Sequence, residues 1–311
     1  MMFSLDFYVV CMVGGLLSCG LTHAGVTPLD LLKCNMQANP SKYTSIKCGF
    51  NKLIRRHGPG ALFKGLVPTF LGYSAQGAVK FGLYEFFKAL YGGEGDGNSN
   101  GRHKTLVYLA SSASAEFIAD IALCPFEALK IRVQTHPDFA IGFFGAALDI
   151  VATQGIKGLY KGLLPLWGRQ IPYTMVKFVC FEKTVEGIYK HGLSMSREEC
   201  PKSVQLGVSF LAGYISGISC ALVSQPADNL VSLINNCKGE TLSTAIAKVS
   251  IASLFTRGLT LRILMVGTLT GAQWGIYDAF KVINGLPPSG TMPSNSDSSK
   301  LGSALSDSLA A

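Results

Sequence analysis

A short segment in which an acid follows a proline by two residues occurs three times along the chain. The three copies begin at Pro28, Pro125 and Pro226. Their prolines are 97 and 101 residues apart, which is too long for a solenoid repeat and suits two membrane-spanning helices with a connecting loop. Because a two-span unit returns the chain to its starting side, successive copies would be parallel and related by an axis along the membrane normal.

Two further landmarks keep the same register. A glycine after a basic residue occurs at Gly65, Gly162 and Gly258, spaced by 97 and 96 residues. A polar residue followed five positions later by an acid occurs in three pairs, Lys80 and Glu85, Lys177 and Glu182, and Gln273 and Asp278. Three landmarks in one register establish an internal triplication.

The triplication predicts the domain organisation. The expected repeats are residues 1–92, 105–191 and 203–284. Residues 93–104 and 192–202 are expected linkers, and residues 285–311 are rich in polar residues and read as a disordered tail.

Composition favours a membrane protein. Charged residues make up 15% of the chain, against roughly 25% in soluble domains. Six apolar runs approach the roughly 20 residues that cross a bilayer. They are residues 7–27, 67–90, 105–124, 164–186, 204–225 and 261–283. We therefore predict an all-α membrane protein with six transmembrane helices in three parallel two-helix repeats of pseudo-threefold symmetry. Asp6 before the first run, with no basic segment, argues against a cleaved secretory signal.

Charge and cysteine patterns exclude several classes. The net charge is +8, and much of the positive charge lies between the predicted spans, which suits an anionic membrane face or an anionic solute. It does not form one face of a soluble fold, so we expect no nucleic-acid binding. The nine cysteines show neither CxxC pairs nor His-Cys spacing, so we expect no metal site. The sequence contains no recognisable hydrolase or kinase motif, so we do not expect an enzyme.

The proline boxes, residues 28–33, 125–130 and 226–231, have a physical role as gates. A proline inside a membrane helix removes a backbone hydrogen bond and bends the helix. The acids and bases of the boxes are costly in lipid, so they should face the bundle interior and pair between repeats as a ring. Charged side chains that simply reach out from a helix end are the alternative explanation.

The triplicate Pro-x-acid-x-x-base pattern resembles the mitochondrial carrier family over residues 7–283. Longer stretches resemble the phosphate-transporting members of that family. They are residues 22–30, 72–82, 115–120, 169–174 and 267–274. The resemblance implies a multi-pass protein of the mitochondrial inner membrane with short matrix helices and bound cardiolipin. It also implies import of inorganic phosphate by proton symport or hydroxide exchange, by alternating access through a central cavity closed by salt-bridge rings.

The chain departs from the family pattern in both expected rings. The proline-box ring contains Asp30, Lys33, Glu127, Lys130 and Asp228, and Val231 stands where a third base belongs. The family's cyclic pairing joins Asp30 to Lys130 and Asp228 to Lys33, which would leave Glu127 alone. The second ring contains Glu85, Lys88, Glu182, Asp278 and Lys281, with Val185 in place of a base. We expect each gate to be weak.

Polar residues on the even-numbered spans form the predicted substrate site. Phosphate needs fixed donors and positive charge at mid-depth. Helical spacing puts Tyr73, Gln76 and Lys80 on one face of the second span. Arg169, Tyr173 and Lys177 share a face of the fourth, and Gln273 is the corresponding residue of the sixth. Lys80 and Arg169 are predicted to converge on the substrate at similar depth. Lys80 and Lys177 could each instead be the ion-pair partner of a neighbouring acid.

Proton coupling is assigned to His23, Glu116 and Glu127. Histidine is the side chain whose charge changes most readily near neutral pH, and His23 lies two turns before Asp30. Glu116 lies three turns before Glu127, so both acids should face the cavity. The resemblance carries the family's proton-linked residues onto the same three positions.

Two alternatives remain. The first is a carrier of the same fold that moves copper, or an anion other than phosphate, with copper also expected as a secondary substrate of a phosphate carrier. The second is a non-transporting membrane component.

Overall fold

The computed structural model describes residues 5–38, 46–92, 101–135, 142–193, 200–236, 259–286, 288 and 289. Within these ranges, the side chains of residues 33, 34, 36–38, 46, 101, 102, 135, 226–236, 260 and 261 lie outside the description. The box residues Lys33, Asp228 and Val231 are among them, so their predicted pairing is outside the described side chains.

Six long helices form the body of the molecule. They are α1 (Leu5–Ala38), α3 (Leu66–Gly92), α4 (Gly101–Thr135), α7 (Leu163–Gly187), α8 (Lys202–Asn236) and α11 (Leu259–Ile283). Each contains one of the six predicted apolar runs, and no strand occurs in the described ranges. The prediction of an all-α fold with six long helices is confirmed.

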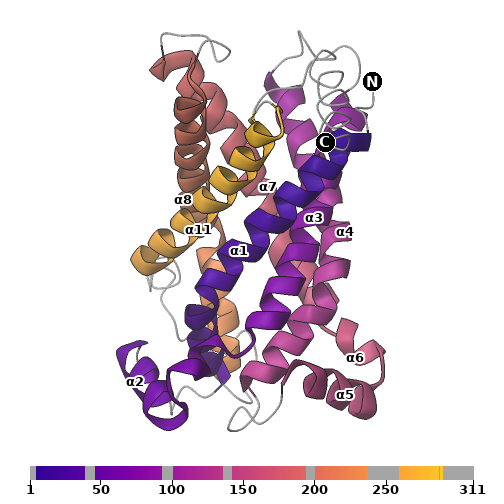
Figure 1. The fold of residues 1–311 in the computed structure, drawn as a ribbon, viewed down its shortest axis with the longest axis vertical. Helices are drawn as coiled ribbons and strands as arrows, with labels where there is room; N and C mark the ends of the chain where they lie inside the picture. The colour runs from indigo at the N-terminus through magenta and orange to yellow at the C-terminus, as the bar shows by residue number, and fades with distance from the viewer. Residues whose placement is uncertain are drawn as a thin grey trace, which may run out of the picture.

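The six helices close into a ring. Each packs on the next in chain order, and α11 packs back on α1. Hairpin partners within a repeat are α1 with α3, α4 with α7, and α8 with α11, and the partners of each pair are in contact, with α1 and α11 inclined to the long axis (Figure 1). This closed ring is the three-pair arrangement that the repeats predict.

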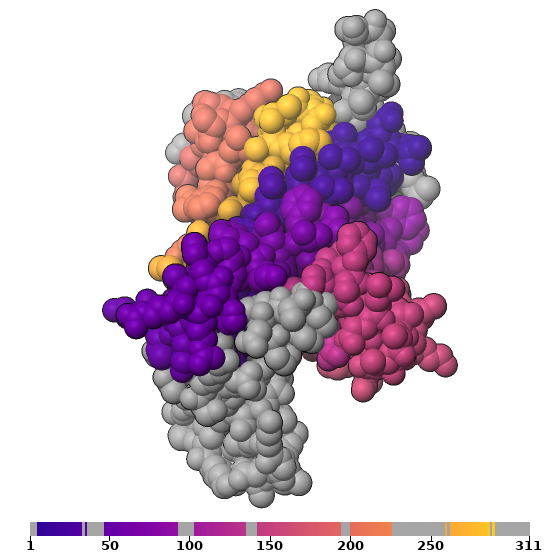
Figure 2. Space-filling model, turned by 60° about the horizontal axis from the view of Figure 1, so that its bottom comes forward, coloured from indigo at the N-terminus to yellow at the C-terminus, as the bar shows by residue number. Residues whose placement is uncertain are grey.

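Short helices lie at one end of the ring. α2 (Ile46–His57), α5 (Phe143–Gln154) and α6 (Lys157–Tyr160) join α1 to α3 and α4 to α7. They lie at the lower end in Figure 1, and Figure 2 shows α2 and the α5–α6 pair on opposite flanks of that end. A 3-10 turn, Pro59–Phe63, follows α2. Residues 237–258, the corresponding segment of the third repeat, lie outside the described ranges.

The landmark glycines come directly before two of the even-numbered spans. Gly65 comes directly before α3, and Gly162 directly before α7. Gly65 has φ of +85°, and a Cβ there would lie 2.9 Å from Nε2 of the buried Gln134. The position therefore requires glycine both for its backbone conformation and for its space. Gly258 is outside the described residues.

Three helical segments are apolar and long enough to cross a membrane by composition alone. They are Leu5–Leu32, His103–Gln134 and Lys202–Gln225. The other long helices, α3, α7 and α11, are at least 25 residues long and therefore about 38 Å, enough to span the hydrocarbon core. They carry more charge, and much of it, including Lys80, Lys177 and Asp278, is buried inside the bundle. Hydropathy underestimates these helices because their polar residues face inward.

Large apolar side chains cover the outside of the ring. Leu21, Val67, Phe117, Leu211 and Leu264, which all belong to the long helices, are each at least 44% exposed. Such a surface is unfavourable in water and favourable against lipid. The inside of the ring carries the buried polar residues, which is the reverse of a soluble helical bundle.

Backbone contact between glycines holds two hairpins together. A Cβ on Gly15 of α1 would lie 2.3 Å from the carbonyl oxygen of Gly77 on α3. In the third repeat a Cβ on Gly217 of α8 would lie 2.7 Å from Cα of Gly267 on α11. Small residues at these crossings let the helices approach until their backbones touch.

Three predicted boundaries are wrong. The predicted spans 7–27 and 105–124 end too early, because α1 and α4 continue through Pro28 and Pro125 for about three more turns. α4 begins at Gly101, inside the predicted linker 93–104. A polar first turn extends this helix beyond its apolar run. The predicted disordered tail begins with ordered residues, because Leu286 and Ser289 are buried.

Candidate functional site

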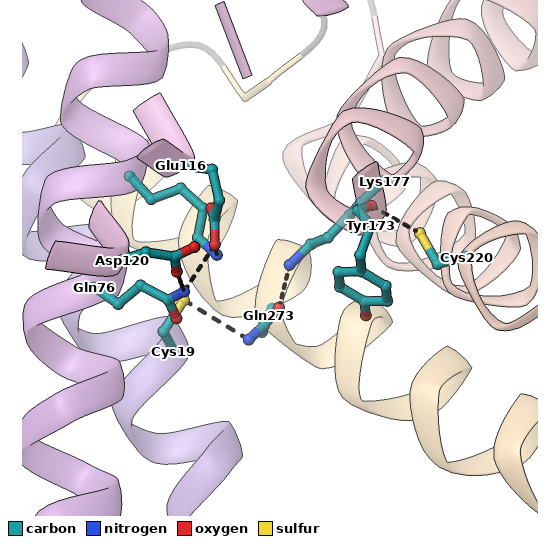
Figure 3. A network of polar contacts seen from close by, with 9 residues as sticks. Cys19, Gln76, Glu116, Asp120, Tyr173, Lys177, Cys220 and Gln273 are labelled. Carbon is teal, nitrogen blue, oxygen red and sulfur yellow. Dashed lines mark hydrogen bonds and ion pairs between the residues drawn. The ribbon is translucent and has the colours of Figure 1, made fainter. Parts of the chain in front are cut away.

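A buried network of charged and amide groups joins α3 to α4 near the centre of the ring. Lys80 Nζ lies 3.0 Å from Oε2 of Glu116, with the lysine side chain 7% exposed and the glutamate fully buried. Gln76 Nε2 donates hydrogen bonds to Oε1 of Glu116 at 2.8 Å and to Oδ1 of Asp120 at 3.1 Å (Figure 3). One lysine and one amide thus hold two carboxylates.

The spacing of these residues explains why they meet. Gln76 and Lys80 are four residues apart on α3, and Glu116 and Asp120 are four apart on α4. Each pair therefore forms one stripe on its helix, and the two stripes face each other across the α3–α4 contact. The cluster carries one more negative than positive formal charge, so it is a favourable place for a bound proton.

A second cation faces this cluster from α7. Lys177 Nζ donates to Oε1 of Gln273 on α11 at 2.6 Å, and Gln273 Nε2 donates to the Cys19 sulfur on α1 at 3.7 Å. Figure 3 shows Gln273 between Lys177 and the α3–α4 cluster. No carboxylate of the described residues lies within ion-pair distance of Lys177, although its side chain is buried. This lysine is a buried cation available to an anion.

An aromatic stack joins His23 to the proline-box ring. The His23 and Tyr73 rings lie parallel, with centroids 3.6 Å apart and an interplanar angle of 6°. Lys130 Nζ lies 5.2 Å from the centroid of the same tyrosine ring. Tyr73 therefore connects a predicted proton-linked residue with a gate lysine.

The proline-box ring is partly paired. Lys130 Nζ lies 3.1 Å from Oδ2 of Asp30, so this predicted inter-repeat ion pair is confirmed. Lys130 also lies 3.8 Å from Oε2 of Glu127, and Arg169 lies 3.8 Å from Oε1 of the same acid. The prediction that Glu127 stands alone is wrong, because a lysine one turn along α4 and an arginine from α7 both reach it.

Arg169 and Lys80 do not act at one depth. Lys80 pairs with Glu116 and Arg169 with Glu127, and these acids are eleven residues, or about 16 Å, apart along α4. Lys177, eight residues beyond Arg169 on α7, is the cation that faces the cluster of Gln76, Glu116 and Asp120 across Gln273 (Figure 3). The predicted convergence of Lys80 and Arg169 is therefore wrong. Arg169 belongs with the proline-box ring.

The second ring is closed by ion pairs and aromatic side chains. Lys88 Nζ lies 2.8 Å from Oε2 of Glu85 and 3.7 Å from Oε1 of Glu182. The Tyr84 hydroxyl donates to Glu182 at 3.2 Å. Beneath this ring lies a cluster of buried aromatic residues, in which Trp274 stacks on Phe181 with centroids 3.5 Å apart.

Asp278 and Lys281 of the second ring have other partners. Asp278 accepts hydrogen bonds from the hydroxyls of Ser209 and Ser289 and from the backbone N–H of Ser289. Lys281 Nζ lies 5.5 Å from the ring centroid of Tyr277 and 5.9 Å from that of Phe7. These two residues do not complete the ring by pairing with each other.

The two rings differ in exposure. The side chains of Glu85, Lys88 and Glu182 are at most 4% exposed, whereas those of Asp30, Glu127 and Arg169 are 24%, 17% and 47% exposed. Lys130 of the proline-box ring is 5% exposed, so this ring is accessible only at its acids and at Arg169, whereas the paired residues of the second ring are all buried.

The sequence reasoning missed several polar partners. Asp120 is not among the predicted site residues, although its spacing of four residues from Glu116 places both acids on one face of the same helix. Ser209 and Ser289 bind Asp278 from outside the repeated landmarks, so the triplication gave no sign of them. Tyr84 does lie beside a ring acid, and its hydroxyl adds a hydrogen bond to Glu182.

Six long helices in three equivalent pairs, with an apolar outside and charged groups within, define a multi-pass membrane protein with a polar interior. The family described as "Mitochondrial carrier protein" matches residues 5–95 and 101–192. These matches cover more than half of the chain, and the chain belongs to the mitochondrial carrier family. It is accordingly a multi-pass protein of the mitochondrial inner membrane.

Individual relatives are similar over most of their length. The chain is 60% identical over 289 residues to "Mitochondrial phosphate carrier protein 3, mitochondrial" of Arabidopsis thaliana, covering 93% of this chain and 77% of the relative. It is 50% identical over 291 residues to "Phosphate carrier protein, mitochondrial" of Caenorhabditis elegans, covering 93% and 85%. It is 50% identical over 281 residues to "Solute carrier family 25 member 3" of Homo sapiens, covering 90% and 77%.

Proposed function

We propose that this protein imports inorganic phosphate into the mitochondrial matrix together with a proton. The names of its relatives supply the substrate class. The observation that carries the proposal is the pair of buried lysines at one level of the ring, Lys80 and Lys177, of which Lys177 has no carboxylate partner among the described residues. Two buried cations beside amide donors suit a small anion with several oxygen acceptors.

The phosphate site in this proposal consists of Lys80 and Gln76 on α3, Lys177 on α7 and Gln273 on α11. Lys177 and Gln273 are already joined, so an anion at Lys177 would exchange one hydrogen-bond acceptor for another. Tyr73 and Arg169 then lie closer to the proline-box ring, on the route that the anion takes to the matrix. The ligands therefore act at two successive depths.

Competition for Lys80 provides the coupling to protons. The Glu116 carboxylate forms an ion pair with Lys80 in this structure, and a bound phosphate would need the same ammonium group. Protonation of Glu116 removes its charge and weakens its hold on Lys80, so proton binding favours phosphate binding. Asp120, joined to Glu116 through Gln76, places a second acid in the cluster, and a proton bound by either acid relieves their mutual repulsion. His23 and Glu127 would pass protons between this cluster and the matrix side.

Alternating access follows from the two rings. We assign the proline-box ring to the matrix side, as the family resemblance implies, and the second ring to the opposite side. The bundle described above is then a matrix-facing state, because its second ring is buried. Import requires the second ring to open while the proline-box ring closes by pairs such as Asp30 with Lys130.

Cardiolipin and copper are further parts of the proposal. Cardiolipin head groups would bind at the starts of α3 and α7, where Gly65 and Gly162 leave backbone N–H groups beside Lys64 and Lys161. Copper as a secondary substrate would contact Cys19, the thiol that accepts a hydrogen bond from Gln273. The two buried lysines nevertheless favour an anion over a free cation.

Transport by the purified protein in liposomes tests the proposal. Labelled phosphate uptake should rise when the lumen is made alkaline, without an applied membrane potential, and unlabelled phosphate should compete while chloride does not. Liposomes without protein and liposomes with the Lys177→Met variant serve as controls. Uptake that ignores the pH gradient would refute proton coupling, and no phosphate uptake at all would refute the substrate.

A further inference from the structure

Asp278 is a ring acid held entirely by hydrogen bonds. Ser209 Oγ on α8 donates to its Oδ2, and Ser289 donates to its Oδ1 from the backbone N at 2.9 Å and from Oγ at 2.7 Å. No cation of the described residues lies within ion-pair distance of this carboxylate, although it is fully buried. Both oxygens are therefore satisfied without an ion pair.

The direction of pairing in the second ring explains this exception. Lys88 of the first repeat reaches Glu182 of the second repeat. The same rotation would carry the base of the second repeat to Asp278 of the third. That base is absent, because Val185 occupies the position and is buried in the apolar core. The missing base is thus the one that would have partnered Asp278.

The chain after α11 turns back to reach the acid. Leu286 N donates to the Lys281 carbonyl and Gly285 N to the Val282 carbonyl, and Gly285 has φ of +77°. This is a Schellman ending, in which a glycine reverses the chain and the next residue packs against the helix. Leu286 is 3% exposed as a result, and Ser289 is 2% exposed. We name residues 286, 288 and 289 the C-terminal strap.

We propose that Ser209 and the C-terminal strap replace the absent base and act as the latch of the second ring. The proposal rests on the proposed function, because a latch has meaning only in a carrier that opens both rings. When the second ring opens, Asp278 exchanges Ser289 for water and the strap leaves the carboxylate. Hydrogen bonds release more readily than a buried ion pair, so the latch holds the ring without locking it.

A strap that merely anchors the end of α11 is the competing explanation. In that case the Schellman ending and the burial of Leu286 would be enough, and the Ser289 side chain would be replaceable without effect on the ring. The latch instead predicts that removing the two hydroxyls loosens the ring, and that restoring a base at position 185 tightens it again. The two explanations therefore differ in a rescue experiment.

The experiment measures how fast the central site becomes accessible through the second ring. Mitochondria that contain the full-length protein are treated with a membrane-impermeant thiol reagent, and labelling of Cys19 is followed by peptide mass spectrometry. Cys19 is 1% exposed and lies in the central network, so it reports opening. We expect the Ser209→Ala, Ser289→Ala double variant to label about tenfold faster than the parent protein. Adding Val185→Lys to the double variant should return the rate toward the parent value.

Ser219→Ala is the matched control, since Ser219 also lies on α8 but donates only to its own helix, at the Ile215 carbonyl. It should label at the parent rate. Equal labelling of the double variant and the parent, with equal melting temperatures, would overturn the latch, as would faster labelling that Val185→Lys does not reverse. The readout needs neither phosphate nor a pH gradient, so it stays informative if the proposed substrate is wrong.

Discussion

Lys80 and Glu116 form an ion pair of 3.0 Å with both side chains buried, and a second buried acid, Asp120, lies one turn further along α4. The pair is therefore part of a cluster with an excess of carboxylates. This imbalance distinguishes the roles of the two central lysines and leads to the first two predictions.

Lys80→Gln and Lys177→Gln should both lose phosphate uptake by at least tenfold, but they should affect stability differently. Removing Lys80 leaves Glu116 and Asp120 buried together, which typically costs about 3–5 kcal/mol. Lys177 has no acid partner among the described residues, so its loss removes a desolvated charge and should leave the melting temperature unchanged or raised. Thermal unfolding in detergent measures the difference. Equal destabilisation by both variants would contradict this charge assignment.

Asp120→Asn should stabilise the protein by about 1 kcal/mol at neutral pH, because it removes repulsion between neighbouring carboxylates. The asparagine oxygen can still accept the hydrogen bond from Gln76. Melting temperatures of the variant and the parent at pH 7 provide the measurement. Asp149→Asn is the control, since it breaks a peripheral pair with Arg132 and should be neutral or slightly destabilising. A clear loss of stability in Asp120→Asn would show that the cluster needs both charges.

Glu116→Gln should separate phosphate exchange from proton-driven uptake. The variant keeps a group that accepts from Lys80 and Gln76 but cannot exchange a proton. Phosphate–phosphate exchange should therefore remain measurable, while uptake driven by a pH gradient falls at least tenfold. Glu186→Gln, which changes a peripheral pair with Lys183, should keep both activities. A Glu116→Gln protein that still responds to the pH gradient would move the coupling role elsewhere.

Tyr73→Leu should reduce transport severalfold and lower stability by about 1 kcal/mol, because the leucine loses both the His23 stack and the Lys130 contact. Tyr73→Phe retains the ring and should behave much like the parent protein. Initial uptake rates and melting temperatures of the two variants make the comparison. If both variants lose activity equally, the hydroxyl is the important group and the ring contacts are not.

The repeat spacing predicted the helices because all three copies must bury the same kind of face. The Asp30–Lys130 pair was also predictable, since both residues belong to the boxes. The partners of Glu127 were not, because the side chain of Arg169 reaches a ring from a position outside its pattern. Spacing along one helix does not say how far a long cation extends toward its neighbour.

The second ring shows a different limit of sequence reasoning. Val185 marked a missing base, and a weak gate was the natural expectation. The structure supplies the partner of Asp278 from a serine on α8 and from the segment after α11, and both lie outside the repeated landmarks. The repeat pattern shows that a base is missing at position 185, but only the structure shows that Ser209 and Ser289 bind the acid instead.

The glycine contact between α8 and α11 has a mechanical consequence. With Gly217 and Gly267 in backbone contact, sliding or rotation of α8 against α11 would cause a clash at this crossing, so we expect these two helices to move together. On α11, Gln273 and Asp278 lie five residues apart, about 7.5 Å along a single helix. An anion at Lys177 that displaces α11 would therefore also move the Asp278 carboxylate held by Ser209 and Ser289, because Gln273 and Asp278 belong to the same helix.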